Sequence, residues 1–206
     1  MGTRKNFDLE KNYAFIKKVT KAANRAGRVT IESYGVENIP KENGFIFFPN
    51  HQGMFDALVF LESCPVPFSV VYKKEVSNVI LLKQVFKALR AIAIDREDIK
   101  QSLQVINQMT EEVKQGRNFL IFPEGTRVKS REEGEPKTGA AMLACRTGVN
   151  VLPVYIPMRK KPFRINRVYI GKPYKMETPG RRANAKDYEV FTEELMDKIY
   201  DLGDGV

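Results

Sequence analysis

Residues 44–56 read GFIFFPNHQGMFD and join an apolar run to a polar turn. The run 44–48 is wholly apolar, which predicts a short strand buried on both faces of a sheet. Residues 57–61 then begin a helical pattern, so the segment between them forms a strand-to-helix turn in which Gly53 supplies flexibility. In open α/β sheets, ligands bind at this carboxyl end of a buried strand. The turn is therefore the first candidate for a functional site.

His51, within this turn, is the only histidine among the 206 residues. Imidazole can take and return a proton near neutral pH, because its unperturbed pKa is about 6.5. Asp56 follows five positions later, where a folded loop would let its carboxylate accept the imidazole N–H and fix the tautomer. A lone histidine is more often structural, so this pair is a hypothesis for a catalytic base that needs support from other segments.

Short apolar runs alternate with helical patterns along the chain, which predicts one α/β domain with a mainly parallel sheet and helices on both faces. Pro153 interrupts one of these runs and is expected to place that strand near a sheet edge. Beyond the run 44–48, strands are expected at 28–34, 67–72, 91–94, 118–122, 151–156 and 167–170. Helices are expected from 57 onward and at 79–89, 97–115, 138–148 and around 188–199.

Composition bounds the class of protein. A hydrophobic content of 43% and a charged content of 29% are ordinary for a folded domain. No apolar run reaches the roughly 18 residues that would span a bilayer, and the N-terminus lacks a signal-peptide core, so we expect a cytoplasmic protein. Cys64 and Cys145 lie far apart without metal-ligand spacing, which predicts free thiols and no metal site.

The net charge of +9 is concentrated in two segments. Residues 1–28 carry eight Lys or Arg against two acids, and residues 159–182 carry nine against one. Such basic segments favour a polyanionic partner, either an anionic membrane or nucleic acid. Residues 8–26 have helical apolar spacing, with Asp8 as the expected N-cap, so we treat 1–28 as a basic amphipathic helix and 29–206 as the domain. The helix either lies in a membrane interface or packs on the domain.

A second polar group is expected at the same sheet edge as His51. Arg96 follows the predicted strand 91–94, and Pro123-Glu124-Gly125-Thr126-Arg127 follows the strand 118–122. Two guanidinium groups beside a glycine-containing turn are typical of a phosphate-binding site. The sequence has neither a G-x-x-x-x-G-K-[ST] loop nor a G-x-G-x-x-G fingerprint, so the common nucleotide sites are not indicated.

The chain resembles the glycerolipid acyltransferase family, the 1-acylglycerol-3-phosphate acyltransferases and their relatives. The resemblance runs from about residue 31 to residue 174. Four blocks carry it, in the family's order: Asn50-His51 with Asp56, Ile94-Asp95-Arg96, Phe122-Pro123-Glu124-Gly125-Thr126-Arg127, and Val151-Leu152-Pro153-Val154-Tyr155-Ile156-Pro157. The third block is the most specific of the four.

The resemblance implies acyl transfer from a thioester, on acyl carrier protein or coenzyme A, to the free hydroxyl of lysophosphatidic acid, giving phosphatidic acid. It makes 29–206 the acyltransferase domain, with His51 as general base and Asp56 as the residue that orients it. The same resemblance assigns acceptor binding to Arg96, Glu124, Gly125, Thr126, Arg127 and Lys137. It implies no metal and no cofactor besides the thioester cosubstrate, and an anionic membrane as partner, with the protein peripheral on the inner face of the cell membrane.

The sequence is also compatible with other functions. The acceptor could be another lysophospholipid or a lyso-aminolipid, and a non-catalytic membrane-binding module would keep the same fold and charge. Nucleic-acid binding fits the pI of about 9.5, but no recognition motif is present and aromatic residues do not interleave with the basic tracts. A covalent acyl-enzyme on Cys64 or Cys145 has no histidine nearby in sequence. Donor chain length would depend on an apolar tunnel lined by 79–89 or by the helix after Asp56.

Overall fold

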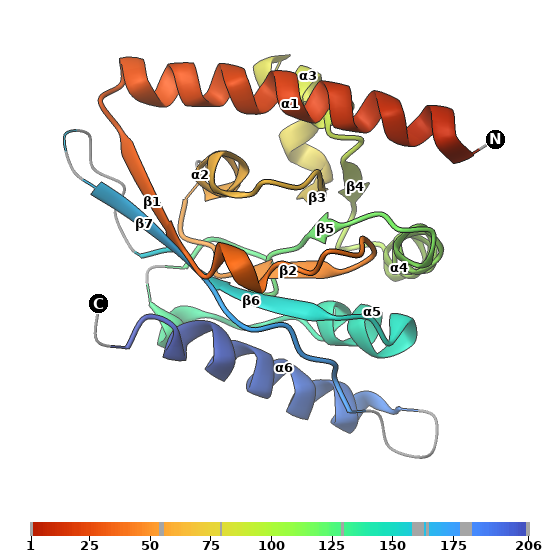
Figure 1. The fold of residues 1–206 in the computed structure, drawn as a ribbon. Helices are drawn as coiled ribbons and strands as arrows, with labels where there is room; N and C mark the ends of the chain where they lie inside the picture. Colours follow the sequence, from red (N-terminus) through yellow and green to blue (C-terminus); the bar gives the residue numbers. More distant parts are fainter. Residues whose placement is uncertain are drawn as a thin grey trace.

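A computed structural model describes residues 2–53, 56–78, 80–128, 130–157, 163, 165–177 and 183–204. In these residues a central sheet lies between two layers of helices (Figure 1). Its strands are β1 (Thr30–Tyr34), β2 (Ile46–Pro49), β3 (Ser69–Lys73), β4 (Ile92–Ile94), β5 (Phe119–Leu120), β6 (Val151–Tyr155) and β7 (Ile165–Ile170). Its helices are α1 (Gly2–Ala26), α2 (Asp56–Ser63), α3 (Ile80–Ala88), α4 (Ile99–Lys114), α5 (Gly139–Thr147) and α6 (Ala185–Asp201), with 3₁₀ turns η1 (Val36–Asn38), η2 (Lys74–Asn78) and η3 (Arg131–Glu133).

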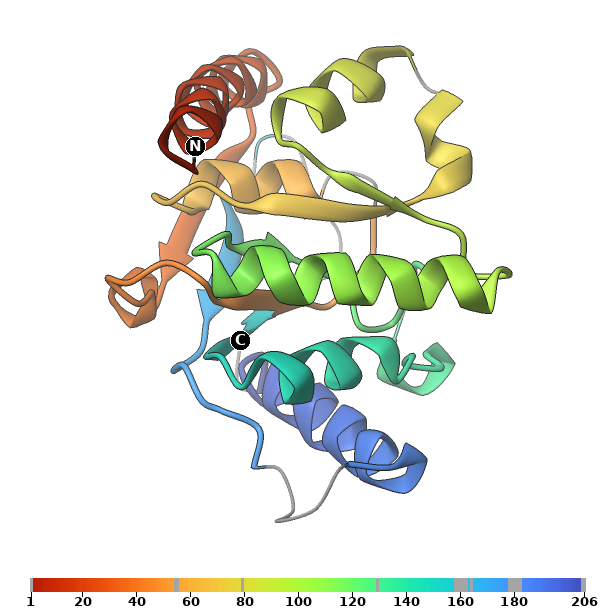
Figure 2. The same ribbon diagram turned by 90° about the vertical axis from the view of Figure 1, so that its right-hand side faces the viewer.

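The seven strands described form one sheet in the order β1-β7-β6-β2-β5-β3-β4. All neighbouring strands pair in parallel except β6 and β7, which are antiparallel. Helices α1, α2 and α3 cover one face, and α4, α5 and α6 cover the other (Figures 1 and 2). The predicted α/β class, with a mainly parallel sheet covered on both faces, is confirmed.

The run 44–48 is buried on both faces, as predicted. Because side chains alternate across a strand, Phe45 and Phe47 enter the core under α1–α3, whereas Ile46 and Phe48 enter the core under α4–α6. All four are at most 1% exposed. Each side chain contributes about 1.5–3 kcal/mol to folding through apolar burial. This central strand therefore holds the turn at 50–56 on a rigid support.

The expectation for Pro153 was wrong: β6 lies inside the sheet, between β7 and β2. Pro153 is opposite Phe48 in the parallel pairing with β2. Its carbonyl accepts the Gly171 N–H on the β7 side, and antiparallel pairing with β7 starts only at Val154. Pro153 thus lies just outside the paired part of β6 and β7, because β7 ends at Ile170. No β-ladder hydrogen bond from an N–H is needed at this position, so proline is tolerated there.

Helix α1 begins at Gly2, earlier than the Asp8 N-cap that the sequence predicted. Its inner face packs on α2: the Tyr13 hydroxyl donates to the Cys64 carbonyl at 3.1 Å, and Lys17 Nζ donates to the same oxygen at 2.6 Å. Its outer face exposes Phe15 (65%) and Val19 (49%). In the described part of the chain, no helix is long and apolar enough to cross a membrane. Six of the nine basic residues in the tract 159–182 lie outside the described residues.

Candidate active site

The turn after β2 brings His51 and Asp56 into contact. His51 Nδ1 lies 3.0 Å from Asp56 Oδ2, which also accepts the backbone N–H groups of Gln52 and Gly53, each at 2.7 Å. Asp56 is the first residue of α2 and is 1% exposed, whereas the His51 side chain is 22% exposed. A carboxylate held by two amides at a helix start is fixed in position, and such hydrogen bonds and the helix dipole favour the ionised form of a carboxyl group.

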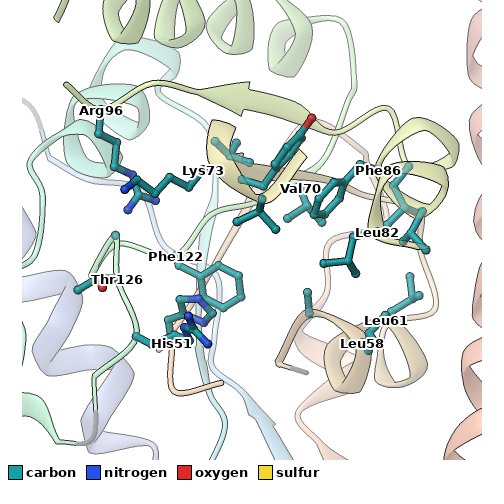
Figure 3. Close-up of a pocket in the computed structure, with 18 residues that line it drawn as sticks. His51, Leu58, Leu61, Val70, Lys73, Leu82, Phe86, Arg96, Phe122 and Thr126 are labelled. Atoms are coloured by element: carbon teal, nitrogen blue, oxygen red, sulfur yellow. The ribbon is translucent and has the colours of Figure 1, made fainter. Parts of the chain in front are cut away.

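This contact determines which imidazole nitrogen can act as a base. An ionised carboxylate only accepts hydrogen bonds, so a neutral imidazole in this contact would carry its proton on Nδ1 and its lone pair on Nε2. The ring stacks on Phe122, with centroids 4.0 Å apart and planes 29° apart (Figure 3). The imidazole is thus held by its edge and by one face, a geometry suited to proton transfer at Nε2.

The backbone around His51 is fixed on both sides. Its N–H donates to Glu124 Oε2 at 2.5 Å, and its carbonyl accepts the Val128 N–H at 2.9 Å. Asn50, which is 0% exposed, exchanges two hydrogen bonds with the backbone of Ile156, at 2.8 and 3.1 Å. The turn is therefore attached to both segments that follow β5 and β6.

Glu124, assigned to acceptor binding at the outset, has its side chain turned into the protein. It is 1% exposed, and its Oε1 accepts the Tyr200 hydroxyl at 2.6 Å while Oε2 accepts the His51 N–H. Burial raises the pKa of Glu124, and the hydrogen bonds from Tyr200 and from the His51 N–H act in the opposite direction. In this structure the carboxylate connects α6 to the His51 turn.

Cationic side chains gather beside this turn. Arg96 and Arg127, both exposed, line the same cavity as His51, together with Lys73 from β3 (Figure 3). Partial desolvation of the guanidinium, the larger influence, lowers the pKa of Arg96, and the Glu75 carboxylate partly opposes this effect. Three cations at one cavity mouth favour an anionic ligand such as a phosphate.

Gly125 is required where it stands. Its φ is +72°, and a Cβ there would lie 3.2 Å from both Arg96 Nη1 and Lys137 Cγ. A side chain would be strained and would push these cations away. The side chain of Lys137 is 63% exposed and lies 3.5 Å from Glu135, and Lys137 does not line the cavity that contains His51. Thr126 lines the cavity from the same turn.

The cavity behind His51 measures about 250 Å³ and is mainly apolar. An apolar tunnel was expected along residues 79–89 or along the helix after Asp56. Both segments contribute to the wall of this cavity: the first through α3 and Leu89, the second through α2. Figure 3 shows His51 and Phe122 at one side of this cavity and the aliphatic side chains of α2 and α3 at the other. Its apolar lining includes Leu58, Leu61, Val70, Leu82, Val85, Phe86 and Leu89.

Several residues at the site were not singled out from the sequence. Asn50 and Phe122 lie inside the sequence blocks that resemble the family, beside His51 and Glu124, so these blocks could have indicated them. Lys73 lies at the carboxyl end of β3, a position shared with the other site residues. Tyr200 lies 76 positions from Glu124, and no local pattern indicates that contact.

Neither cysteine lines the cavity that contains His51. Burial raises the pKa of the Cys64 and Cys145 thiols to about 11. A thiol with a raised pKa is a poor nucleophile near neutral pH. Among the described residues, no group of three His, Cys, Asp or Glu side chains could hold a metal ion.

Comparison with known proteins places the chain in a family. The family described as Acyltransferase matches residues 30–157, more than half of the 206. The chain belongs to this acyltransferase family. A 1-acyl-sn-glycerol-3-phosphate acyltransferase from Pseudomonas aeruginosa is 35% identical over 184 residues, which cover 83% of this chain and 70% of that protein. The resemblance read from the four sequence blocks is confirmed.

Other acyltransferases match over a shorter range. A protein of the same name from Borreliella burgdorferi is 30% identical over 120 residues, and a probable one from Mycoplasma pneumoniae is 32% identical over 126. The chain spans about half the length of these two relatives, 48% and 46%. The crystal structure of PlsC, the 1-acyl-sn-glycerophosphate acyltransferase from Thermotoga maritima, superposes with a TM-score of 0.68 at 22% identity and covers 94% of this chain and 81% of that one. At this identity the similarity establishes the shared fold.

Proposed function

We propose that the chain transfers a fatty acyl group from an acyl thioester to the free hydroxyl of lysophosphatidic acid, giving phosphatidic acid. One observation carries the proposal: the His51–Asp56 pair lies at the side of an apolar cavity whose mouth also holds Arg96 and Arg127. A base, an anion site and an apolar wall are the three elements this transfer needs. The names of the related acyltransferases support the same reaction.

The proposed reaction uses this geometry. His51 Nε2 accepts the proton of the attacking hydroxyl, while Asp56 orients the ring and stabilises the imidazolium. The hydroxyl oxygen forms a bond to the acyl carbon, and the C–S bond of the thioester breaks. The imidazolium then returns its proton to the leaving thiolate. A thioester is already activated, so the step needs neither a covalent nucleophile on the protein nor a metal or a further cofactor.

The apolar cavity is proposed to hold the fatty chain of the donor, which is either acyl carrier protein or coenzyme A thioester. Arg96, Arg127 and Lys137, with the turn at Gly125 and Thr126, are proposed to bind the phosphate of the acceptor. Glu124 is proposed to act as a positioning residue through the backbone of His51. This division assigns the chemistry to the turn after β2 and the anion to the turns after β4 and β5.

We further propose that α1 holds the protein on an anionic membrane. Its exposed Phe15 and Val19 are four residues apart, on one side of the helix, and the exposed Lys11, Lys18 and Lys21 lie along one flank of this side. Such a face can place apolar groups at the acyl boundary and cations among anionic head groups. Because α1 contacts both α2 and α3, the walls of the donor cavity would lie next to the lipid surface.

The test of this function is acyl transfer by the wild-type protein from oleoyl-coenzyme A and oleoyl-acyl carrier protein. Lysophosphatidic acid is compared with lysophosphatidylcholine, lysophosphatidylglycerol and a lyso-aminolipid. Product formation with lysophosphatidic acid above the others is the expected result. Preference for another acceptor would overturn the acceptor assignment. Binding to anionic vesicles without transfer to any acceptor would indicate a membrane-binding module.

Arg96→Ala is expected to raise the KM for lysophosphatidic acid roughly 10- to 100-fold, since a hydrogen bond to a charged group contributes about 1.5–3 kcal/mol. The effect should be smaller with a monoacylglycerol acceptor, which has no phosphate. Arg146→Ala is the matched control, because Arg146 is exposed on α5 and bonds to Asn107 at 2.7 Å, away from the cavity with His51. An equal loss with both acceptors would contradict a phosphate-binding role.

Tyr200→Phe is expected to lower kcat roughly 3- to 10-fold and to leave KM for both substrates nearly unchanged. The change keeps the ring but removes the hydroxyl that donates to Glu124. Because that hydrogen bond lowers the pKa of Glu124, its loss raises this pKa further. Glu124 then protonates at a higher pH and holds the His51 N–H less well, so the acid limb of the pH–kcat profile should move to higher pH.

Tyr174→Phe is the control for that experiment. The Tyr174 hydroxyl is buried without a hydrogen-bond partner among the described residues, so its removal deletes the same atom but breaks no bond. We expect an unchanged pH profile and an unchanged amide ¹⁵N shift at His51, whereas Tyr200→Phe should move both. If the two variants behave alike, Tyr200 has only a packing role.

A further inference from the structure

A second apolar cavity lies on the other face of the sheet. It measures about 280 Å³ and is bounded by α4, through Ile106 and Met109, and by the start of α5, through Gly139 and Ala140. The donor cavity is bounded instead by α2 and α3. Apolar cavities of this size are rare in a well-packed domain and are the usual sites of apolar ligands.

The two cavities meet at the candidate active site. Arg96, Phe122 and Val71 line both of them, and Phe122 is the residue on which His51 stacks. Lys137 lines the second cavity together with Arg96, and a Cβ on Gly125 would lie 3.2 Å from both of these side chains. The second cavity therefore has an apolar interior and a cationic rim that it shares with the proposed anion site. A molecule with an anionic head and one fatty chain has the complementary charge and polarity.

Resting on the proposed function, we infer that the cavity between α4 and α5 binds the fatty chain of the lysophosphatidic acid acceptor. The reaction brings together two single-chain molecules, so both chains must be accommodated while their reacting groups meet near His51. The donor chain occupies the cavity under α2 and α3. The acceptor chain then enters on the opposite face, with its phosphate between Arg96 and Lys137 and its hydroxyl directed to His51.

Gly139 is a position at which this inference can be tested. Glycine is disfavoured within helices, yet no backbone feature requires it at the start of α5. A Cβ there would lie 3.7 Å from Ile106 Cδ1, an ordinary contact across the cavity. A larger side chain would thus extend toward α4 and fill the cavity without strain in the backbone.

The first experiment locates the chain directly. The probe is a lysophosphatidic acid analogue that lacks the free hydroxyl and carries a diazirine near the end of its chain. Photolysis is expected to label peptides of α4 and α5. A non-hydrolysable acyl-coenzyme A thioether with the same diazirine should label α2 and α3. Acceptor label on α2, on α3 or only on α1 would overturn the inference. Because neither probe turns over, acceptor label on α4 without transfer by the wild type would refute the proposed function alone.

The second experiment uses variants that fill one cavity each. Gly139→Leu should raise the KM for 1-palmitoyl acceptor roughly tenfold, and that for 1-hexanoyl acceptor less than about twofold, since about two methylenes lose their burial. Leu82→Trp, in the donor cavity, should shift preference to shorter donors and leave acceptor preference unchanged. Ala185→Leu is the matched control, because it enlarges an exposed residue at the start of α6.

The outcomes separate the two assignments. A change in donor chain preference in Gly139→Leu, or an equal rise in KM for both acceptors, would overturn the inference. Gly139→Ala provides a smaller step that favours the helix, and it should give a smaller shift in the same direction. Thermal unfolding of each variant shows that the cavity, rather than the fold, has been altered.

Discussion

His51→Ala is expected to lower kcat for acyl transfer about 10²- to 10⁴-fold, because it removes the base that accepts the hydroxyl proton. Attack by a hydroxyl that keeps its proton would remain, with the substrates still bound. KM for both substrates should therefore change little. The measurement is steady-state transfer from oleoyl-coenzyme A or oleoyl-acyl carrier protein to lysophosphatidic acid by matched preparations of wild type and variant.

The fold should tolerate this substitution. The hydrogen bonds that hold residue 51 to Glu124 and Val128 come from its backbone, so alanine keeps them. The loss of the Phe122 stack and of the contact with Asp56 should reduce the free energy of unfolding by about 1–2 kcal/mol. A folded variant with wild-type kcat would show that His51 is not the base.

Asp56→Asn is expected to lower kcat by about 10²- to 10⁴-fold, close to the effect of losing the base itself. An asparagine oxygen can still accept the Gln52 and Gly53 N–H groups, so the turn is retained. Its amide NH₂ would then face His51 Nδ1 and donate to it, which moves the imidazole proton to Nε2. The ring would present a donor to the substrate hydroxyl instead of a lone pair.

Asp98→Asn is the control for this change. Asp98 caps α4 by accepting the Gln101 N–H, and asparagine caps helices equally well. Both variants remove one carboxylate at a helix start, but only Asp56→Asn should alter kcat. The ¹⁵N chemical shifts of the His51 ring report the tautomer directly. Unchanged ring shifts in Asp56→Asn, with normal kcat, would contradict the orienting role.

The sequence was informative where local patterns and topology coincide. Alternating apolar and helical runs predicted the covered parallel sheet, because strands buried on both faces leave continuous apolar stretches. The sequence also predicted that His51, Arg96 and Arg127 would lie at one edge of the sheet, since each follows a predicted strand, and in the structure all three line one cavity. These three residues belong to the sequence blocks on which the resemblance to the acyltransferase family was based.

Contacts between distant segments could not be predicted in this way. Strand order is decided by packing across the whole domain, so Pro153 was misplaced at an edge although it is opposite Phe48 inside the sheet. The hydrogen bond from Tyr200 to Glu124 depends on where α6 crosses β6. The second cavity depends on the distance between α4 and α5 at Gly139. None of these quantities is encoded in local periodicity.

The pairing of β1 with β7 has a consequence for biosynthesis. Thr30 lies opposite Ile165, so β1 cannot pair until β7, which is synthesised about 135 residues later, is available. Contacts this remote in sequence slow folding, because the intervening loop must close before the pairing stabilises it. On the ribosome, α1 would emerge well before the sheet beside it is complete. We therefore expect the nascent helix to be able to meet a lipid surface before the domain that it later packs against is complete.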